Sequence, residues 1–201
     1  MLPTKSNLIK LKKTIGLSKQ GQELLEKKKY ILIKEKEKYI LEREKLKEQC
    51  IEVYNLAFNS LRDANVDLGI RKVKAISNEI QIDNNLEIKY KTVMGVDIPI
   101  TLYKEEASSI PFGLLETSIS LDNAIANFRK LKETMIKIVE NTTTINRLEF
   151  AIQKVQKRSN SLKDVIIPNY EIERKSIENI LDEKDREEFI RLKLIKSSYN
   201  S

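Results

Sequence analysis

Apolar residues recur at alternating spacings of three and four along the first third of the chain. One set of positions with this seven-residue period comprises Leu11, Ser18, Leu25, Leu32, Tyr39, Leu46, Val53 and Ser60. The companion set comprises Leu8, Ile15, Gln22, Lys29, Lys36, Arg43, Cys50, Ala57 and Ala64. Such positions form one stripe, here called the seam, along a coiled-coil helix. The pattern predicts a helix from Thr4, a capping residue, to Leu68, about 95 Å long at 1.5 Å per residue.

The last part of the chain has a similar seam. Its members are Phe128, Leu131, Met135, Ile138, Ile145, Leu148, Ile152, Val155, Ser159, Leu162 and Ile166. Pro168 interrupts it, and a kink is expected there because proline lacks an N–H and clashes with the carbonyl four residues earlier. We expect the stripe to resume beyond the proline through Ile172, Ile177, Ile180, Phe189 and Leu192.

The middle of the chain changes rhythm. After Gly69 a short helical pattern is followed, from Glu87 to Tyr103, by alternation of period two, which predicts a β-hairpin. A two-residue Gly95-Val96 loop would pair Tyr90 with Thr101. A three-residue loop would pair Tyr90 with Ile100 and gather the apolar residues on one face. We favour the three-residue loop, with Pro99 on an edge strand.

These elements predict a mainly α fold. The expected segments are residues 1–68, an N-terminal coiled-coil helix; residues 69–113, a short helix with the hairpin; and residues 114–201, a C-terminal coiled-coil helix kinked near Pro168. Each long helix has one seam, so an antiparallel two-helix coiled coil with a small α/β module at the turn would bury both.

Composition excludes several classes of chemistry. The 201 residues include no histidine, which removes histidine catalysis and histidine-ligated metals, and one cysteine, which cannot form an internal disulfide. No apolar run approaches the roughly 18 residues of a membrane span. We therefore expect a cytoplasmic protein with no cofactor, no metal and no membrane insertion.

The net charge of +7 lies in the first 50 residues, which hold 14 Lys and Arg against 7 Asp and Glu. Such an excess suits nucleic acid or an acidic protein surface, but it also suits a solvated helix face. Because no nucleic-acid reader motif accompanies it, we expect no nucleic acid partner.

Glycine spacing in Gly16-Leu17-Ser18-Lys19-Gln20-Gly21-Gln22-Glu23 resembles that of a phosphate-binding loop. The motif fails because Gln22 and Glu23 replace its Lys and Ser/Thr, and because the string lies within a helical pattern. Gly21 would instead allow a neighbouring helix or subunit to approach closely.

Three cations, Lys29, Lys36 and Arg43, occupy seam positions. Their alkyl stems could line the seam while the charges reach water. Alternatively, this stretch packs weakly on its own chain because it meets another protein. Both readings remain open from the sequence.

Several strings together resemble one family. They are Pro3-Thr4-Lys5, Val93-Met94-Gly95-Val96, Val165-Ile166-Ile167-Pro168 and Arg186-Glu187-Glu188-Phe189-Ile190-Arg191-Leu192-Lys193. In this order and spacing they resemble the D subunit of the V-type (archaeal or vacuolar) ATPase and ATP synthase, over nearly the whole chain.

The resemblance implies a non-catalytic axle in the central stalk of a rotary complex. Its expected partners are the A and B subunits of the catalytic ring, the F subunit, and the d/C-type subunit seated on the membrane rotor ring. The complex would place the chain in the cytoplasm, peripheral to the membrane. The expected partner interface comprises Val93, Met94, Gly95, Val96, Gly21, Lys29, Lys36, Arg43, Arg186, Phe189 and Arg191.

Two other classes share a coiled-coil sequence. A prefoldin-like holdase combines coiled coil and hairpin, but its chains are shorter and its helix tips apolar, whereas Met1-Leu2-Pro3-Thr4-Lys5 and Lys196-Ser197-Ser198 are mostly polar. A coiled-coil scaffold or nucleoid-binding protein would be distinguished by salt-dependent DNA binding.

Overall fold

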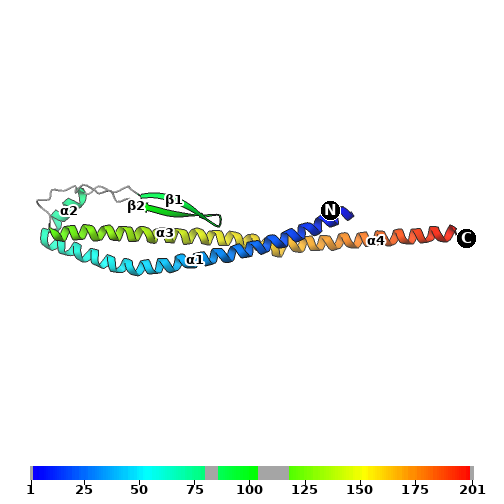
Figure 1. Cartoon of the computed structure of the whole chain (residues 1–201), viewed down its shortest axis with the longest axis horizontal. Coiled ribbons are helices and arrows are strands. Elements are labelled where there is room, and N and C mark those ends of the chain that lie inside the picture. The colour runs from blue at the N-terminus through cyan, green and yellow to red at the C-terminus, as the bar shows by residue number, and fades with distance from the viewer. Residues whose placement is uncertain (1, 80–85, 104–117, 200–201) are drawn as a thin grey trace. The chain divides into compact units, whose positions relative to one another are not determined.

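The structure is a computed structural model and describes residues 2–79, 86–103 and 118–199. In chain order its elements are α1 (Lys5–Leu68), α2 (Ile70–Glu79), β1 (Leu86–Val93), β2 (Val96–Tyr103), α3 (Ile119–Ser161), a π-helical turn (Leu162–Ile166) and α4 (Ile167–Tyr199) (Figure 1). The mainly α fold with one hairpin is confirmed. The division at residues 68 and 113 stays a prediction. Contacts group residues 1–31 with 152–201, and residues 32–151 form a second compact unit.

The predicted start and seam of α1 are confirmed. The Asn7 backbone N–H donates to Thr4 Oγ1 at 3.2 Å, so Thr4 caps the helix. Every position of the two seven-residue sets is buried or half-buried, and Leu32, Ala57 and Ala64 are completely buried. The helix ends at Leu68, and the next residue, Gly69, has a φ of +81°, the left-handed conformation in which helices commonly terminate.

In the unit of residues 1–31 and 152–201, α1 and α4 run antiparallel. Three ion pairs join them at seven-residue steps: Lys5–Asp185 at 3.3 Å, Lys12–Glu178 at 2.9 Å and Lys19–Glu171 at 2.7 Å. Residue numbers rise along α1 while those of their partners fall along α4, so the two helices are antiparallel. Between the helices lies an apolar cluster of Leu8, Leu11, Ile15, Tyr170, Ile177 and Leu181.

In the unit of residues 32–151, α1 and α3 are also antiparallel. Asn127 Nδ2 donates to Ser60 Oγ at 3.1 Å, and seven residues further on α1 the Ser120 hydroxyl donates to the Asp67 carboxylate. An apolar cluster unites the end of α1 with α2 and α3; its buried members are Ala64, Val73, Leu121 and Ala124. The antiparallel pairing of the long helices thus holds within each unit.

The seam of α3 differs from the prediction at one upstream position. Leu131, Ile145, Leu148 and Val155 are buried as expected. Met135, however, is 45% exposed, so its assignment to the seam was wrong. The polar residues Asn141 and Thr144 are buried instead, at 7% and 1% exposure, where an apolar pattern gives no signal.

The chain passes Pro168 through a π-helical turn. The Ile167 N–H bonds to the Leu162 carbonyl, five residues earlier, in place of the usual four. The wider turn lies just before Pro168, which has no N–H to donate to an earlier carbonyl. It also adds one residue to the helix. Such turns are a known cause of kinks, but the kink itself stays a prediction.

The extra residue moves the seam beyond the proline. Before the proline, buried or half-buried positions alternate by four and three residues through Val155, Ser159, Leu162 and Ile166. If this spacing continued unbroken, the next such positions would be 169, 173, 176 and 180. The structure instead shields Tyr170, Arg174, Ile177 and Leu181, each one position later. The predicted continuation is therefore correct at Ile177 only. Its other members are exposed: Ile172 by 67%, Ile180 by 42%, Phe189 by 68% and Leu192 by 60%.

The hairpin is confirmed, but its register was predicted incorrectly. Val93 pairs with Val96 across a two-residue Met94-Gly95 turn, so Tyr90 lies opposite Pro99 rather than Ile100 or Thr101. Met94 and Gly95 have φ of +51° and +78°, the combination of a tight turn that matches strand twist. With this register, the apolar residues of β1 and those of β2 occupy opposite faces.

Candidate partner interfaces

The hairpin docks on α3 through the outer edge of β2. The Thr101 backbone N–H donates to Glu140 Oε2 at 2.8 Å, and its hydroxyl donates to the same oxygen. Arg147 Nη1 donates to the Asp97 carbonyl at 2.8 Å and its guanidinium lies 5.0 Å from the centre of the Tyr90 ring. These contacts hold the hairpin along α3 (Figure 1).

The hairpin contacts α3 along its length because the contacting parts of the two elements are of similar length. The Lys132 ammonium lies 4.7 Å from the centre of the Tyr103 ring, at one end of the contact. The other end joins Arg147 to Asp97. Fifteen helical residues cover about 22 Å and six strand residues about 20 Å, so the two elements keep step.

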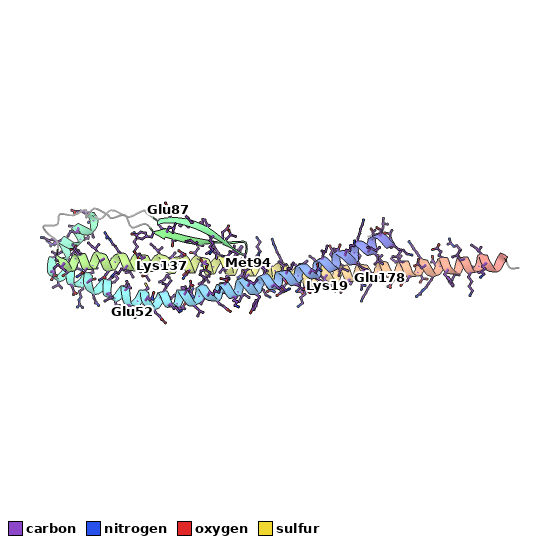
Figure 2. The ribbon with its side chains drawn as sticks, in the orientation of Figure 1. Lys19, Glu52, Glu87, Met94, Lys137 and Glu178 are labelled. Carbon is purple, nitrogen blue, oxygen red and sulfur yellow. The ribbon has the colours of Figure 1, made fainter. Side chains whose placement is uncertain are left out.

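The tip of the hairpin carries an exposed apolar side chain on a residue with positive φ, a conformation unfavourable for most residues. Met94 lies at the turn (Figure 2) and is 49% exposed, while Val93 and Val96 are half-buried and Gly95 is exposed. A side chain other than Gly, Asn or Asp at positive φ costs about 1 kcal/mol or more. The tip therefore combines an exposed methionine with local strain.

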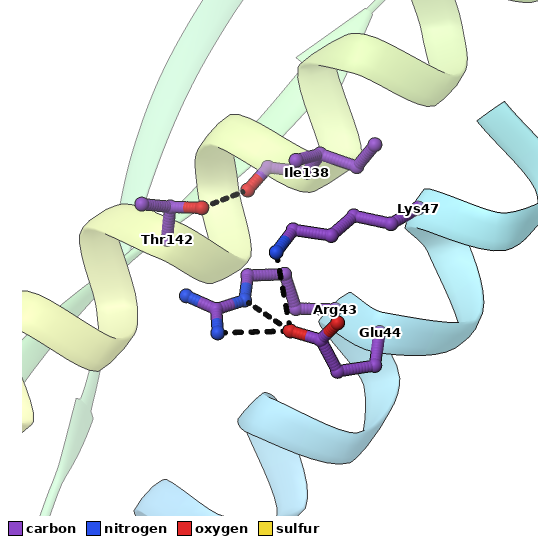
Figure 3. Close-up of polar contacts among 5 residues, drawn as sticks. All are labelled: Arg43, Glu44, Lys47, Ile138 and Thr142. Carbon is purple, nitrogen blue, oxygen red and sulfur yellow. Dashed lines mark hydrogen bonds and ion pairs between the residues drawn. The ribbon is translucent and has the colours of Figure 1, made fainter. Parts of the chain in front are cut away.

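The seam cations are partly shielded and two of them are paired. Lys29 Nζ lies 2.5 Å from Glu26 Oε2. Arg43 donates to Glu44 Oε1 through Nε at 3.3 Å and Nη2 at 3.0 Å, and Lys47 approaches the same oxygen at 3.2 Å. Figure 3 shows Arg43 lying between α1 and the turn of α3 that carries Thr142. Lys36 is half-buried. These contacts agree with cations whose stems line the seam.

A polar cluster lies in the seam one turn beyond Gly21. The Ser159 hydroxyl, 1% exposed, donates to Glu26 Oε1 at 2.6 Å. The hydrogen bond from Lys29, followed by that from Ser159, lowers the pKa of the Glu26 carboxyl below its usual value. At Gly21 itself, an added Cβ would meet no atom within 4 Å. No described residue thus requires glycine there.

The end of α4 is exposed on all sides. Residues 182–196 are all exposed, including Arg186, Phe189 and Arg191. Arg186 and Phe189 also line a shallow depression together with Asp182, Asp185 and Ile190. Arg186 Nη1 lies 3.7 Å from Glu183 Oε2, a pair whose side chains are both largely solvated. The depression is too open to enclose a small molecule.

A metal-binding cluster is not found in the described residues. Within residues 2–79, 86–103 and 118–199, no three His, Cys, Asp or Glu side chains gather to hold a metal ion. The Gly16–Glu23 string lies inside α1, not after a strand. Among the described helices, none has the length and apolar character needed to cross a membrane.

The sequence did not predict the contacts between the hairpin and α3, which involve Thr101, Glu140 and Arg147. A signal existed: Glu140 and Arg147 are seven residues apart and lie off the seam, so they share a second face of α3. Their hairpin partners could not be identified without the register. The predicted interface residues lie at the hairpin tip, on α1 and on the end of α4, and their partner contacts stay predictions.

Comparison with known proteins gives a consistent result over nearly the full length. The family described as the D subunit of ATP synthase matches residues 7–197. The D subunit of the V-type ATP synthase of Thermotoga neapolitana is 35% identical over 194 residues, covering 96% of each chain. The D subunit of the A-type ATP synthase of Pyrococcus horikoshii is 35% identical over 198 residues, covering 97% of this chain and 92% of the relative. The chain belongs to the family of ATP synthase D subunits.

Proposed function

We propose that this chain is the non-catalytic axle of the central stalk in a rotary V/A-type ATP synthase. It would couple ATP hydrolysis or synthesis in a ring of A and B subunits to ion movement through the membrane rotor. The F subunit and the d/C-type subunit would be its other neighbours, and the chain would lie on the cytoplasmic side, peripheral to the membrane.

The exposed end of α4 supports this proposal most directly. Phe189, Ile190, Leu192, Leu194 and Ile195 are between 49% and 68% exposed. At 100° per residue these five positions are distributed around the whole helix. Arg191 and Lys193 lie among them, but large apolar side chains that point to every side of an exposed helix are ordinarily covered by protein. A ring that encloses the end of an axle would supply such surroundings.

The paired long helices suit the transmission of torque. In the unit of residues 1–31 and 152–201, three ion pairs at seven-residue steps and an apolar cluster join α1 to α4. In the other unit, α1 and α3 share a buried seam. Two helices joined along a seam resist bending and twisting better than one. Exposed pairs contribute little each, so the apolar seam carries most of this stiffness.

Substitution of Phe189 and Leu192 by serine tests the proposal. Both side chains are exposed, so the isolated double variant should fold as the parent does. In a reconstituted complex it should weaken retention by the A and B subunits and lower the yield of coupled ion transport. Replacement of the neighbouring Glu187 and Lys193 by serine is the matched control, because these exposed positions are polar. Equal retention of parent and double variant would count against an enclosed axle.

Nucleotide binding provides an independent test. The Gly16–Glu23 string lacks the lysine and hydroxyl that hold phosphate and Mg²⁺, so the isolated chain should show no saturable binding of Mg²⁺-ATP by calorimetry. Micromolar binding would contradict a non-catalytic role.

A further inference from the structure

The two edges of the hairpin differ sharply. In a two-residue hairpin the pair flanking the turn is hydrogen-bonded, here Val93 with Val96. Alternation then directs the backbone groups of Leu86, Ile88, Tyr90 and Thr92 away from β2. On β2 the outward positions are Asp97, Pro99, Thr101 and Tyr103.

The outward edge of β2 is protected. The Asp97 carbonyl accepts a hydrogen bond from Arg147, Pro99 has no N–H, and the Thr101 N–H donates to Glu140. These are devices by which natural proteins prevent further strand pairing. Because the Thr101 N–H donates to Glu140 of α3 and not to β1, Thr101 is one of the positions whose backbone groups point outward.

The outward edge of β1 has no such protection in the described part of the chain. No described residue forms a hydrogen bond with the outward N–H and C=O groups of Ile88 and Tyr90. All of β1 except Val93 is exposed, with Ile88 at 52% and Tyr90 at 59%. An exposed, regular edge of eight residues is a template for one further strand.

The side chains of β1 select the chemistry of that strand. Lys89 and Lys91 lie on one face and, among the described residues, neither forms an ion pair. Ile88 and Tyr90 lie on the other face. A strand added at this edge would place its residues directly opposite the two lysines in the closer, non-hydrogen-bonded pairs, where opposite charges stabilise pairing.

A second copy of this chain would fit poorly in the antiparallel register about Tyr90, which uses nearly the whole length of β1. Antiparallel pairing of two β1 strands about Tyr90 would place Lys89 opposite the other copy's Lys91, and like charges directly opposite are destabilising. We propose that β1 is a docking edge for an extended segment of a partner protein, with acidic residues two apart and apolar residues between them.

The test uses the full chain and a short synthetic peptide of alternating valine and glutamate, with fluorescence anisotropy as the readout. Saturable binding is expected, together with slower amide exchange at Ile88 and Tyr90. A peptide with lysine in place of glutamate should not bind. Absence of saturable binding by the glutamate peptide at millimolar concentration would overturn the proposal.

Proline replacement tests the edge itself. Ile88→Pro removes an outward N–H without removing a rung of the β1–β2 ladder, as Pro99 does on β2, and should weaken binding by about tenfold or more. Ile88→Val keeps the N–H and is the matched control. Continued protection of the Lys89 and Lys91 amides would verify that the hairpin remains folded.

A modified peptide keeps the test independent of folding. N-methylation of alternate residues on the pairing edge removes the donors while leaving the side chains and charge unchanged. If the methylated and unmodified peptides bind the parent equally, main-chain pairing is excluded and the proposal fails. The axle function proposed above would be unaffected by that result.

Discussion

Truncation of Leu148 to alanine tests whether the α3 seam carries the stability. Leu148 is completely buried within the unit of residues 32–151. Burying a leucine side chain contributes about 1.5–3 kcal/mol, and the cavity left by truncation adds to that loss. Because helical neighbours collapse only partly into such a space, we expect a loss of about 3 kcal/mol, within the usual range of about 2–5 kcal/mol.

Urea unfolding followed by circular dichroism at the helical band would measure this loss. For a chain of this length, about 3 kcal/mol corresponds to a fall in Tm of roughly 6–12 °C. Phe150→Ala is the matched control, because Phe150 lies two residues away on α3 and is 69% exposed. Alanine also has the higher helix propensity, so this variant should be neutral or slightly stabilised.

The comparison of the two variants decides the matter. If Leu148→Ala costs less than about 1 kcal/mol, or Phe150→Ala costs as much as Leu148→Ala, the assignment of the seam is refuted. A change in the dependence of unfolding free energy on urea would instead indicate a change in the compactness of the unfolded chain or a departure from two-state unfolding.

Three further changes test the polar and strained positions. Lys36→Leu should leave the unfolding free energy unchanged or raise it, since Lys36 is half-buried at a seam position; unfolding of this variant would contradict the register. Ser159→Ala should destabilise by about 1 kcal/mol at neutral pH. Because the hydrogen bonds from Lys29 and then Ser159 lower the pKa of Glu26 in the folded chain, the charge-assisted part of this contribution exists above the unfolded pKa and is lost as pH falls through the folded value, so the difference between variant and parent should shrink in acid. Met94→Asn should slow amide exchange in the hairpin ladder, because asparagine tolerates positive φ; faster exchange would show that Met94 is not strained.

Much of the helical architecture could be predicted because a seven-residue apolar period is a local property of the sequence. Any helix that carries such a stripe must bury it, whatever its partner is. The α1 seam was therefore correct even at Lys29 and Arg43, where the residue type argued against burial. The hairpin was likewise indicated by its period of two.

Tertiary structure decided what depends on a single residue of offset. The π-helical turn before Pro168 adds one residue and moves the α4 seam from position 180 to Leu181, which an unbroken period cannot anticipate. The hairpin register also differs from the prediction: the two-residue turn at Met94 and Gly95 sets the pairing, and in this register the outer edge of β2 bonds to Glu140 and Arg147 of α3. Periodicity determines which element forms and roughly which stripe is buried. Strand register and the choice of which helix face is buried depend on hydrogen bonds and packing between segments that are distant in sequence, and only the folded chain brings those segments together.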